Sequence, residues 1–198
     1  MTGPTSVYHI GRMRIWIATV SEQVPLDSSA ERLLRGGIWA HELARRGHQV
    51  VWWTDNVDHM RKRVRSRQNT SVSLAANLEL RMVAGPGYKR NISAARLLHY
   101  RTTSRELGRW MSASEPPDVC IAALPALEWV NSALDVGESK RFPVVVDCRD
   151  MWPDLFVDLL PAYLRWPGRL ALSPLFRQKQ RALRRAFAIS GITAQFLE

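Results

Sequence analysis

The chain has two cysteines and no long apolar run, and these two features limit the kinds of protein that it can be. No apolar stretch approaches the roughly 20 residues that span a bilayer. Residues 1–12 lack the charged-then-apolar order of a secretory signal. Cys120 and Cys148 lie in or beside apolar, strand-like runs, which favours buried reduced thiols over a disulfide or a metal pair. These deficits indicate a cytoplasmic protein, with residues 1–12 as a leader or a disordered segment.

Acidic residues are also scarce. The chain holds 28 Lys and Arg but 18 Asp and Glu, a formal charge of +10 at pH 7. Much of the excess lies in residues 61–67 and 177–185. Basic surfaces attract nucleic acid, anionic lipid or phosphorylated small molecules, although an arginine-rich solvated face explains such segments as well. With 198 residues, 46% of them hydrophobic, the chain suits one folded domain.

Apolar runs and helical patterns alternate along residues 13–198. Strands are expected at residues 13–20, 50–54, 78–83, 119–123, 143–147 and 186–190. Helices are expected in the pattern from Leu33 to Leu43, which ends before Gly47, at residues 93–112, 127–134 and 168–185, and from 192 onward. Asp27, Ser28 and Ser29 are candidate N-caps of the first helix, and Gly47 fits its left-handed end. Pro174 should cap or kink the helix that contains it. Strand–helix–strand crossovers imply parallel strands, so the sequence predicts a doubly wound, mostly parallel, Rossmann-like α/β sheet.

Residues 144–154 combine a predicted strand with a close group of charged and aromatic residues. A β-branched run ends in Asp147, followed by Arg149, Asp150 and Trp152. Ligands of open α/β sheets bind beyond the carboxyl ends of the strands, so charges here are candidates for a site. Paired carboxylates perform acid–base chemistry. A structural ion pair between Arg149 and Asp150 is the alternative, and local spacing does not decide between them.

Three other strand-to-helix loops carry candidate ligand contacts. After the first strand, Arg32 and Arg35 precede or begin a helix, whose N-terminus favours anions. No G-x-G-x-x-G or Walker motif accompanies them, which disfavours a dinucleotide or P-loop site. The alternative is an ordinary capped helix in which Gly36 and Gly37 permit close packing.

His59 follows the second strand, where its pKa suits proton transfer or neutral hydrogen bonding, and no Cys/His spacing supports a metal site. In the third loop, Tyr88 could stack on a sugar ring, and Lys89 and Asn91 could bind phosphate or hydroxyl groups. An incidental surface histidine and an ordinary turn followed by a helix cap are the alternatives.

Several motifs together resemble the N-terminal half of bacterial family 4 glycosyltransferases, in the branch that assembles lipopolysaccharide and capsule sugars. The most specific are Asp58–Arg63 (D-H-x-R-K-R), Gly87–Asn91 (G-Y-K-R-N) and Arg149–Asp154 (R-D-M-W-P-D). Leu43–Val50 (L-A-x-x-G-H-x-V) is common and weakly specific. The resemblance begins at Met13 and runs to the end of the sequence.

The resemblance implies two facing Rossmann-like halves. The N-terminal half, residues 13–198, would receive the acceptor, and a C-terminal donor-binding domain would hold the nucleotide-sugar. It also implies retention at the anomeric carbon, without a metal or a cofactor other than the nucleotide-sugar co-substrate. The implied catalytic residues are Asp150 and His59. The implied substrate-binding residues are Arg32, Arg35, Lys62, Tyr88, Lys89, Asn91, Arg149 and Trp152. One departure concerns Gly36 and Gly37: many members place a glycine pair ahead of the helix, against the donor phosphates, whereas here the pair is expected inside it.

The resemblance also suggests the partners. Acceptors in this branch are lipid-linked sugars or polysaccharide, which would place the protein peripherally at the inner face of the plasma membrane. Residues 61–67 and 177–185 and the face bearing Arg101, Arg105 and Arg109 could dock on anionic lipid, at on the order of 1 kcal/mol per basic residue. Two alternatives stay open. One is a non-catalytic subunit that completes a split glycosyltransferase in trans. The other is a basic nucleic-acid-binding domain, disfavoured because no reader motif accompanies the arginines.

Overall fold

The computed structural model describes residues 11–27, 32–149, 157 and 159–192. Seven strands form the main sheet: β1 (Arg14–Ala18), β2 (Gln49–Asp55), β5 (Thr70–Ala75), β6 (Leu78–Val83), β7 (Val119–Ala123), β8 (Val144–Cys148) and β9 (Ala188–Gly191). A small hairpin consists of β3 (Val57–Asp58) and β4 (Arg63–Val64). The described helices are α1 (Arg35–Arg45), α2 (Ala94–Ala113), α3 (Leu127–Lys140), α5 (Ala162–Ala171) and α6 (Ser173–Arg185).

The strands lie in the order β5-β6-β2-β1-β7-β8-β9, and every neighbouring pair except β5–β6 is parallel. From β1 the chain passes to β2 and then to the edge strand β5, returns as β6 between β5 and β2, and crosses to the other side of β1 with β7. Strand order therefore reverses between β1 and β7. In doubly wound sheets the ligand crevice lies at the carboxyl ends of the two strands that flank such a reversal. The predicted fold class is confirmed.

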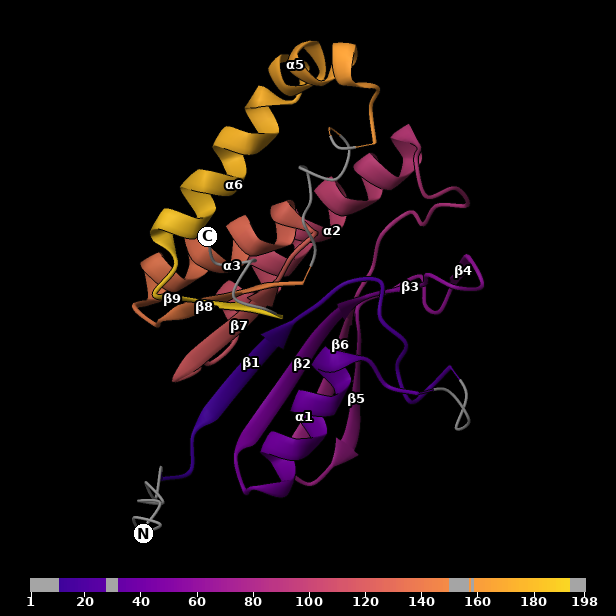
Figure 1. Ribbon diagram of the computed structural model, residues 1–198. Helices are drawn as coiled ribbons and strands as arrows, with labels where there is room; N and C mark the ends of the chain where they lie inside the picture. Colours follow the sequence, from indigo (N-terminus) through magenta and orange to yellow (C-terminus); the bar gives the residue numbers. More distant parts are fainter. Residues whose placement is uncertain (1–10, 28–31, 150–156, 158, 193–198) are drawn as a thin grey trace, which may run out of the picture.

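Alternation along the central strands divides the core into two layers. Trp16 of β1 and Trp53 of β2 pack into one hydrophobic cluster. Ile17 of β1 and Trp52 of β2 pack into the other. Helices α2, α3 and α6 contribute to the cluster that contains Trp16, and α1 to the cluster that contains Ile17. Figure 1 shows α1 on one face of the sheet and α2, α3 and α6 on the other. Both faces of β1 and β2 are thus buried, which explains their continuous apolar runs.

The helix and strand predictions hold with several differences. The antiparallel edge strand β5 and the β3–β4 hairpin were missed, α3 extends to Lys140, and the helix expected at residues 168–185 is divided between α5 and α6. Pro174 lies in the first turn of α6, which agrees with its expected role as a cap. Gly47 adopts φ +91°, as predicted for the end of the first helix. Asp27 is not the N-cap of α1: the helix begins at Arg35, and Asp27 instead accepts hydrogen bonds from Arg65.

Some predictions fall outside the described residues. These are the caps Ser28 and Ser29, the leader over residues 1–10 and the helix over residues 193–198. Both cysteines are buried and free, in agreement with the prediction of reduced thiols. Burial raises the pKa of the Cys120 thiol to about 12, so this thiol stays protonated.

Candidate functional site

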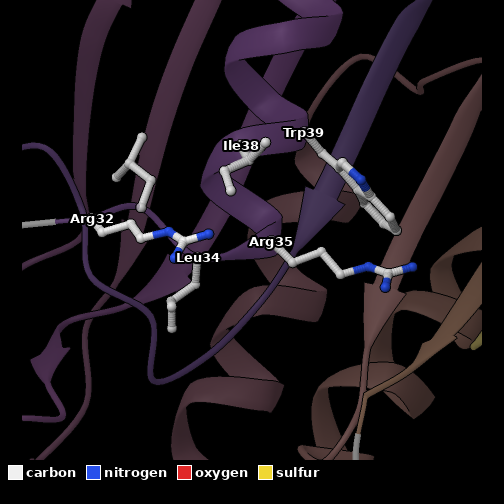
Figure 2. A pocket seen from close by; sticks show the side chains of 6 residues that line it. Arg32, Leu34, Arg35, Ile38 and Trp39 are labelled. Atoms are coloured by element: carbon white, nitrogen blue, oxygen red, sulfur yellow. The ribbon is translucent and has the colours of Figure 1, made fainter. Parts of the chain in front are cut away.

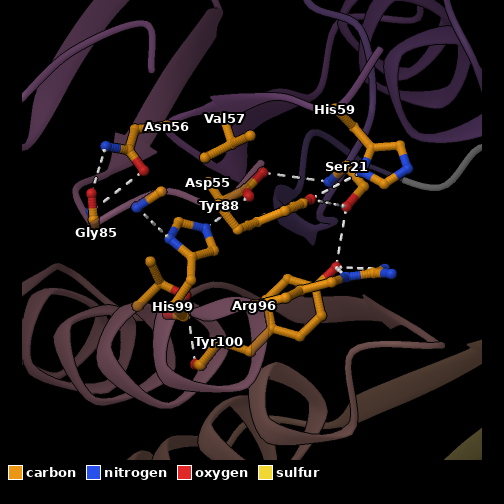
Figure 3. Close-up of polar contacts among 12 residues, drawn as sticks. Ser21, Asp55, Asn56, Val57, His59, Gly85, Tyr88, Arg96, His99 and Tyr100 are labelled. Atoms are coloured by element: carbon orange, nitrogen blue, oxygen red, sulfur yellow. Dashed lines mark hydrogen bonds and ion pairs between the residues drawn. The ribbon is translucent and has the colours of Figure 1, made fainter. Parts of the chain in front are cut away.

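Two polar clusters occupy the carboxyl ends of the strands, and the loop after β1 connects them. Ser21 belongs to the first cluster and Glu22 to the second. We call the first the tyrosine–histidine cluster: Ser21, Asp55, His59, Tyr88, Arg96, His99 and Tyr100 (Figure 3). We call the second the arginine–carboxylate cluster: Glu22, Arg35, Asp147, Arg149 and Ser190.

A buried histidine forms the base of the tyrosine–histidine cluster. His99 and Asp55 are fully buried, and His99 Nε2 lies 2.9 Å from Asp55 Oδ2. The backbone N–H of Gly87 donates to His99 Nδ1 at 3.2 Å, so the ring carries its proton on Nε2 and donates it to Asp55. Asp55 Oδ1 accepts the backbone N–H of Ser21 at 3.2 Å. This chain of contacts fixes the loops after β1, β2 and β6 relative to one another.

Tyr88 connects this buried base to His59. The Tyr88 hydroxyl lies 2.8 Å from His59 Nδ1 and 3.3 Å from Ser21 Oγ. Burial, and then the neighbouring Tyr100, raise the pKa of Tyr88 above its ordinary value, so the hydroxyl keeps its proton at any physiological pH. The ring is buried against His99 and Tyr100, with ring centroids at 5.3 and 6.2 Å. Tyr88 therefore holds His59, and its ring does not lie open for the sugar stacking that the sequence suggested.

His59 is the half-buried outer member of the cluster. Burial lowers its pKa below 6.5, and the positive charges of Lys62 and Arg96 lower it further. Lys62 Nζ lies 3.3 and 3.4 Å from the two ring nitrogens and also donates to the carbonyl of His59. An ammonium at this position repels a protonated ring. His59 is therefore neutral near pH 7 and can accept or donate a hydrogen bond.

Arg65 holds the β3–β4 hairpin that carries His59. Its guanidinium is buried and bonds Asp27 at 2.7 and 2.5 Å. It also donates to the carbonyl oxygens of Val57, at 2.7 Å, and Glu22, at 3.0 Å. One cation thus ties the hairpin to the loop after β1. Since this charge is neutralised and buried, Arg65 cannot contribute to a membrane-docking surface, contrary to the expectation for residues 61–67.

The arginine–carboxylate cluster follows β1 and β8. Asp147 is fully buried and accepts from Arg149 Nε at 2.5 Å and from Ser190 Oγ at 2.6 Å, and Arg35 Nη2 lies 3.2 Å away. Arg149 also pairs with Glu22 through Nη1. The expected partner Asp150 lies outside the described residues, and within them the partners of Arg149 are Asp147 and Glu22. Both are strand-end acids, and Glu22 comes from a distant part of the chain.

Glu22 also occupies the N-terminus of α1. Its carboxylate accepts the backbone N–H groups of Gly36 and Gly37, both at 3.3 Å. A Cβ on Gly36 would lie 2.7 Å from Glu22 Oε2 and from a methyl group of Thr19, so only glycine permits this approach. The glycine pair lies inside the helix, as predicted. The anion at this helix N-terminus is the protein's own carboxylate, and a phosphate would have to displace it.

A surface pocket of about 600 Å³ lies beside this cluster (Figure 2). Its lining residues are Arg32, Leu33, Leu34, Arg35, Ile38 and Trp39. The guanidinium groups of Arg35 and Arg149 lie 4.4 and 5.8 Å from the Trp39 ring centroid. Arg35 therefore belongs to both the pocket wall and the arginine–carboxylate cluster.

The structure places the predicted site residues in two groups. His59, Lys62 and Tyr88 meet in the first cluster, and Arg35 and Arg149 meet in the second. Arg32 lines the pocket, and Lys89 and Asn91 are exposed in the loop that holds Tyr88. Asp150 and Trp152 lie outside the described residues. Among the described residues, no three His, Cys, Asp or Glu side chains are grouped so as to hold a metal ion.

Sequence reasoning missed several members of the clusters. Glu22 and Asp55 are acids that follow a strand, which is the signal that identified Asp147. His99 lies at helical spacing with the buried Thr103, Leu107 and Met111 of α2, so the position of its side chain in the core was predictable from periodicity. Its role as a donor to Asp55 was not, because the partner is 44 positions away.

His99→Phe should remove both hydrogen bonds of the buried ring while retaining a planar aromatic group. Asp55 would keep its bond from Ser21 but lose its side-chain donor, and the N–H of Gly87 would lose its acceptor. We expect a loss of about 2–4 kcal/mol in the free energy of unfolding. Denaturant titration measures it, with the exposed His41→Phe as the control. Equal values for the two variants would contradict the structural role.

The sheet order defines an α/β domain of the doubly wound class, and the polar groups at its switch point are a candidate ligand site. The family model of the glycosyl transferase 4-like domain matches residues 38–198, and the chain belongs to this family. No curated protein sequence matches the chain.

Proposed function

We propose that the domain is the acceptor-binding half of a retaining, metal-independent glycosyltransferase. The enzyme would move a sugar from a nucleotide-sugar to a lipid-linked or polysaccharide acceptor. Family membership supports the transferase chemistry. One observation carries the proposal: two chemically different polar clusters flank the switch point, joined through the adjacent residues Ser21 and Glu22.

The tyrosine–histidine cluster suits the acceptor. A neutral His59 at the rim can hydrogen-bond a sugar hydroxyl, and Tyr88 fixes the ring in position. Lys62 lies against His59, and Lys89 is exposed in the neighbouring loop. These two cations complement the diphosphate of a lipid carrier. Asp150, which the family resemblance implicates in catalysis, remains part of the proposal although it lies outside the described residues.

The arginine–carboxylate cluster suits the phosphates of the donor. Of the described side chains, Arg35 Nε and Arg149 Nη2 are buried nitrogens without a hydrogen-bond partner. Phosphate oxygens would satisfy them, and Arg32 would add a third guanidinium from the pocket wall. Without a phosphate, the Glu22 carboxylate pairs with Arg149 and accepts the backbone N–H groups at the N-terminus of α1. A donor phosphate would take over these contacts.

The reaction that follows breaks the bond between the anomeric carbon and the phosphate oxygen. The acceptor hydroxyl forms its bond to the same face of the sugar, and its proton passes to the leaving phosphate. The chain's own groups orient the hydroxyl and stabilise the phosphate charge. Neither role requires a metal ligand.

A donor screen on the full-length protein tests the proposal. We expect one nucleotide-sugar to transfer its sugar to a lipid-linked acceptor, with release of the nucleotide in equal amount, as detected by mass spectrometry. Transfer that appears only after a separate chain is added would favour the split-enzyme alternative. Failure of every donor, with and without added chains, would contradict a transferase function.

The rate of transfer should depend on the protonation of His59. Its pKa lies below 6.5, so the neutral ring persists under mildly acidic conditions and the rate should fall only as the pH drops through the lowered pKa. Since an unfolded histidine takes up its proton at the higher, ordinary pKa, acidification below pH 6.5 should also destabilise the fold. His59→Gln should remove the acid limb from the pH–rate profile. An unchanged limb in that variant would assign it to another group.

A further inference from the structure

The tyrosine–histidine cluster contains a continuous chain of hydrogen bonds that runs from Arg96 to His59 (Figure 3). Arg96 donates to the hydroxyl of Tyr100 through Nε at 3.0 Å and Nη2 at 2.8 Å. The Tyr100 hydroxyl lies 3.0 Å from Ser21 Oγ, which lies 3.3 Å from the Tyr88 hydroxyl. The Tyr88 hydroxyl in turn lies 2.8 Å from His59 Nδ1. Each hydroxyl can donate one proton, so the direction of donation depends on what the end groups allow.

Arg96 fixes this direction because a guanidinium only donates. The Tyr100 oxygen accepts two N–H groups of Arg96, so its own proton is donated to Ser21, the other partner of that hydroxyl among the described residues. Ser21 Oγ accepts this proton and donates its own to Tyr88. The Tyr88 oxygen has then accepted, and its proton is donated to His59 Nδ1. A neutral imidazole whose Nδ1 accepts carries its proton on Nε2.

The distances support the same direction. The Tyr88 hydroxyl is closer to the imidazole nitrogen, at 2.8 Å, than to Ser21 Oγ, at 3.3 Å. A phenol donates its strongest hydrogen bond to the better acceptor, and an imidazole nitrogen accepts better than a hydroxyl oxygen. The reversed chain would also leave the Ser21 proton without an acceptor among the described side chains. Lys62 Nζ lies 3.3 and 3.4 Å from the two ring nitrogens, so it favours neither tautomer.

The backbone holds the chain of hydroxyl groups in place. Arg96 lies in the first turn of α2, and its Nη1 donates to the carbonyl of Asn91 at 2.8 Å. Ser21 has φ +61°, a left-handed conformation that is strained for a residue other than glycine. Its N–H donates to Asp55 while its Oγ contacts both tyrosine hydroxyls. Strain of this kind concentrates at functional sites.

We propose that Arg96 is a positioning residue that sets the tautomer of His59, with the ring proton on Nε2 and Nδ1 accepting from Tyr88. The inference rests on the proposed function and deepens it, because it specifies what His59 offers to the acceptor. In this tautomer the outer nitrogen is a donor without a free lone pair. His59 therefore donates to an oxygen of the acceptor sugar and does not take the proton of the attacking hydroxyl, which passes to the leaving phosphate.

This tautomer also gives the expected acid limb of the pH–rate profile a structural cause. Protonation of His59 would add a hydrogen to Nδ1 and abolish the bond from Tyr88 that holds the ring. The ring would keep a donor on Nε2 but lose its fixed orientation.

Nitrogen NMR of the full-length protein, labelled with ¹⁵N-histidine, tests the proposal. Protonated and unprotonated ring nitrogens differ strongly in chemical shift, and comparison with His59→Gln assigns the signals of His59. At about pH 8, above the lowered pKa of His59, we expect the shifts of a neutral ring that carries its proton on Nε2. A proton on Nδ1 in the parent protein would overturn the proposal.

Two variants break the chain at different points. Tyr100→Phe retains the buried ring but removes the hydroxyl that connects Arg96 to Ser21. Ser21 Oγ can then accept from Tyr88, so we expect a measurable fraction of His59 to carry its proton on Nδ1. Arg96→Met should have the same effect. Arg96→Lys should retain the Nε2 tautomer, because an ammonium also only donates.

Arg101→Met is the matched control, since Arg101 is exposed on α2 and belongs to neither cluster. Its histidine spectrum should match that of the parent. Melting temperatures recorded on the same samples show that each variant is folded at the temperature of the measurement. A pure Nε2 tautomer in both Tyr100→Phe and Arg96→Met would also overturn the proposal, because the tautomer would then not depend on Arg96.

The rate of transfer provides a separate readout. We expect kcat/KM for the acceptor to fall about tenfold in Tyr100→Phe and to stay near the parent value in Arg96→Lys. A tautomer that changes as expected in a protein that transfers no sugar would support the role of Arg96 and contradict only the proposed function. A changed tautomer with unchanged kcat/KM would overturn the role of His59 as a donor to the acceptor.

Discussion

Asp147→Ala should be among the most destabilising substitutions in the domain, with an expected loss of about 3–5 kcal/mol in the free energy of unfolding. The carboxylate is fully buried and pairs with Arg149 and Arg35, and it also accepts the hydroxyl of Ser190. Its removal leaves the Arg149 guanidinium in a largely buried position with Glu22 as its remaining acidic partner. Breaking a buried ion pair from one side costs more than the pair itself contributes, because the other charge stays desolvated. Urea titration followed by circular dichroism measures the change.

Asp135→Ala is the matched control. Asp135 also pairs with an arginine, Arg185, but its side chain is 68% exposed. Arg185 keeps its second partner, Glu138, so the expected change is no more than about 1 kcal/mol. Similar losses for the two aspartate variants would mean that Asp147 does not anchor the arginine–carboxylate cluster.

His59→Ala should lower the rate of transfer about 100-fold in the full-length enzyme while leaving the fold intact. The ring is half-buried at the rim of its cluster, and Tyr88 keeps its contact with Ser21 after the substitution. The loss arises because the acceptor hydroxyl would no longer have a positioned neutral imidazole to hydrogen-bond. Initial rates at saturating donor measure it, with the melting temperature recorded on the same samples.

His41→Ala provides the comparison for that experiment, since His41 is exposed on α1 and belongs to neither cluster. It should transfer at the parent rate. A His59 variant that transfers equally well would remove His59 from the proposed acceptor site. A His59 variant whose rate falls only in proportion to its folded fraction would assign the residue a structural role.

The sequence predicted those parts of the fold whose signal is local. Strands β1, β2 and β8 are buried on both faces, so each appears as a continuous apolar run. Strand β5 was missed because it lies at an edge and alternates exposed with half-buried residues, half of them Ser or Thr. The first part of α5, residues 162–167, was missed because Pro167 lies inside the helix, and proline ordinarily marks a helix end.

The site could be predicted only in part, because its decisive contacts are non-local. The sequence places Arg149 beside Asp150, and local spacing therefore suggests a pair. The structure also brings Glu22 to Arg149 across 127 positions, once β1 and β8 lie in the same sheet, and no local pattern indicates that contact. Likewise, Tyr88 has an aromatic ring of the kind that stacks on sugars, and only its packing against His99 and Tyr100 of α2 shows that the ring is buried. Residue types at strand ends identified loops that the structure brings together at one end of the sheet, and tertiary packing determines the contacts within them.

Ion pairs at the carboxyl end of the sheet also account for part of the basic character of the chain. Arg35, Arg65 and Arg149 are paired there with Asp147, Asp27 and Glu22. The charge excess on the surface is therefore carried by other segments, of which α5 and α6 combine it with exposed apolar side chains. Within the described residues, no helix is long and apolar enough to cross a membrane.

Photo-crosslinking of a lipid-linked acceptor that carries a diazirine on its terminal sugar tests the location of the acceptor site most directly. The full-length protein would be irradiated with the acceptor bound, and the labelled peptides mapped by mass spectrometry. Labelling within residues 57–64 and 86–91, reduced by an excess of unlabelled acceptor, is the expected result. Labelling confined to the opposite end of the sheet, such as residues 46–49 or 114–118, would contradict an acceptor site at the tyrosine–histidine cluster.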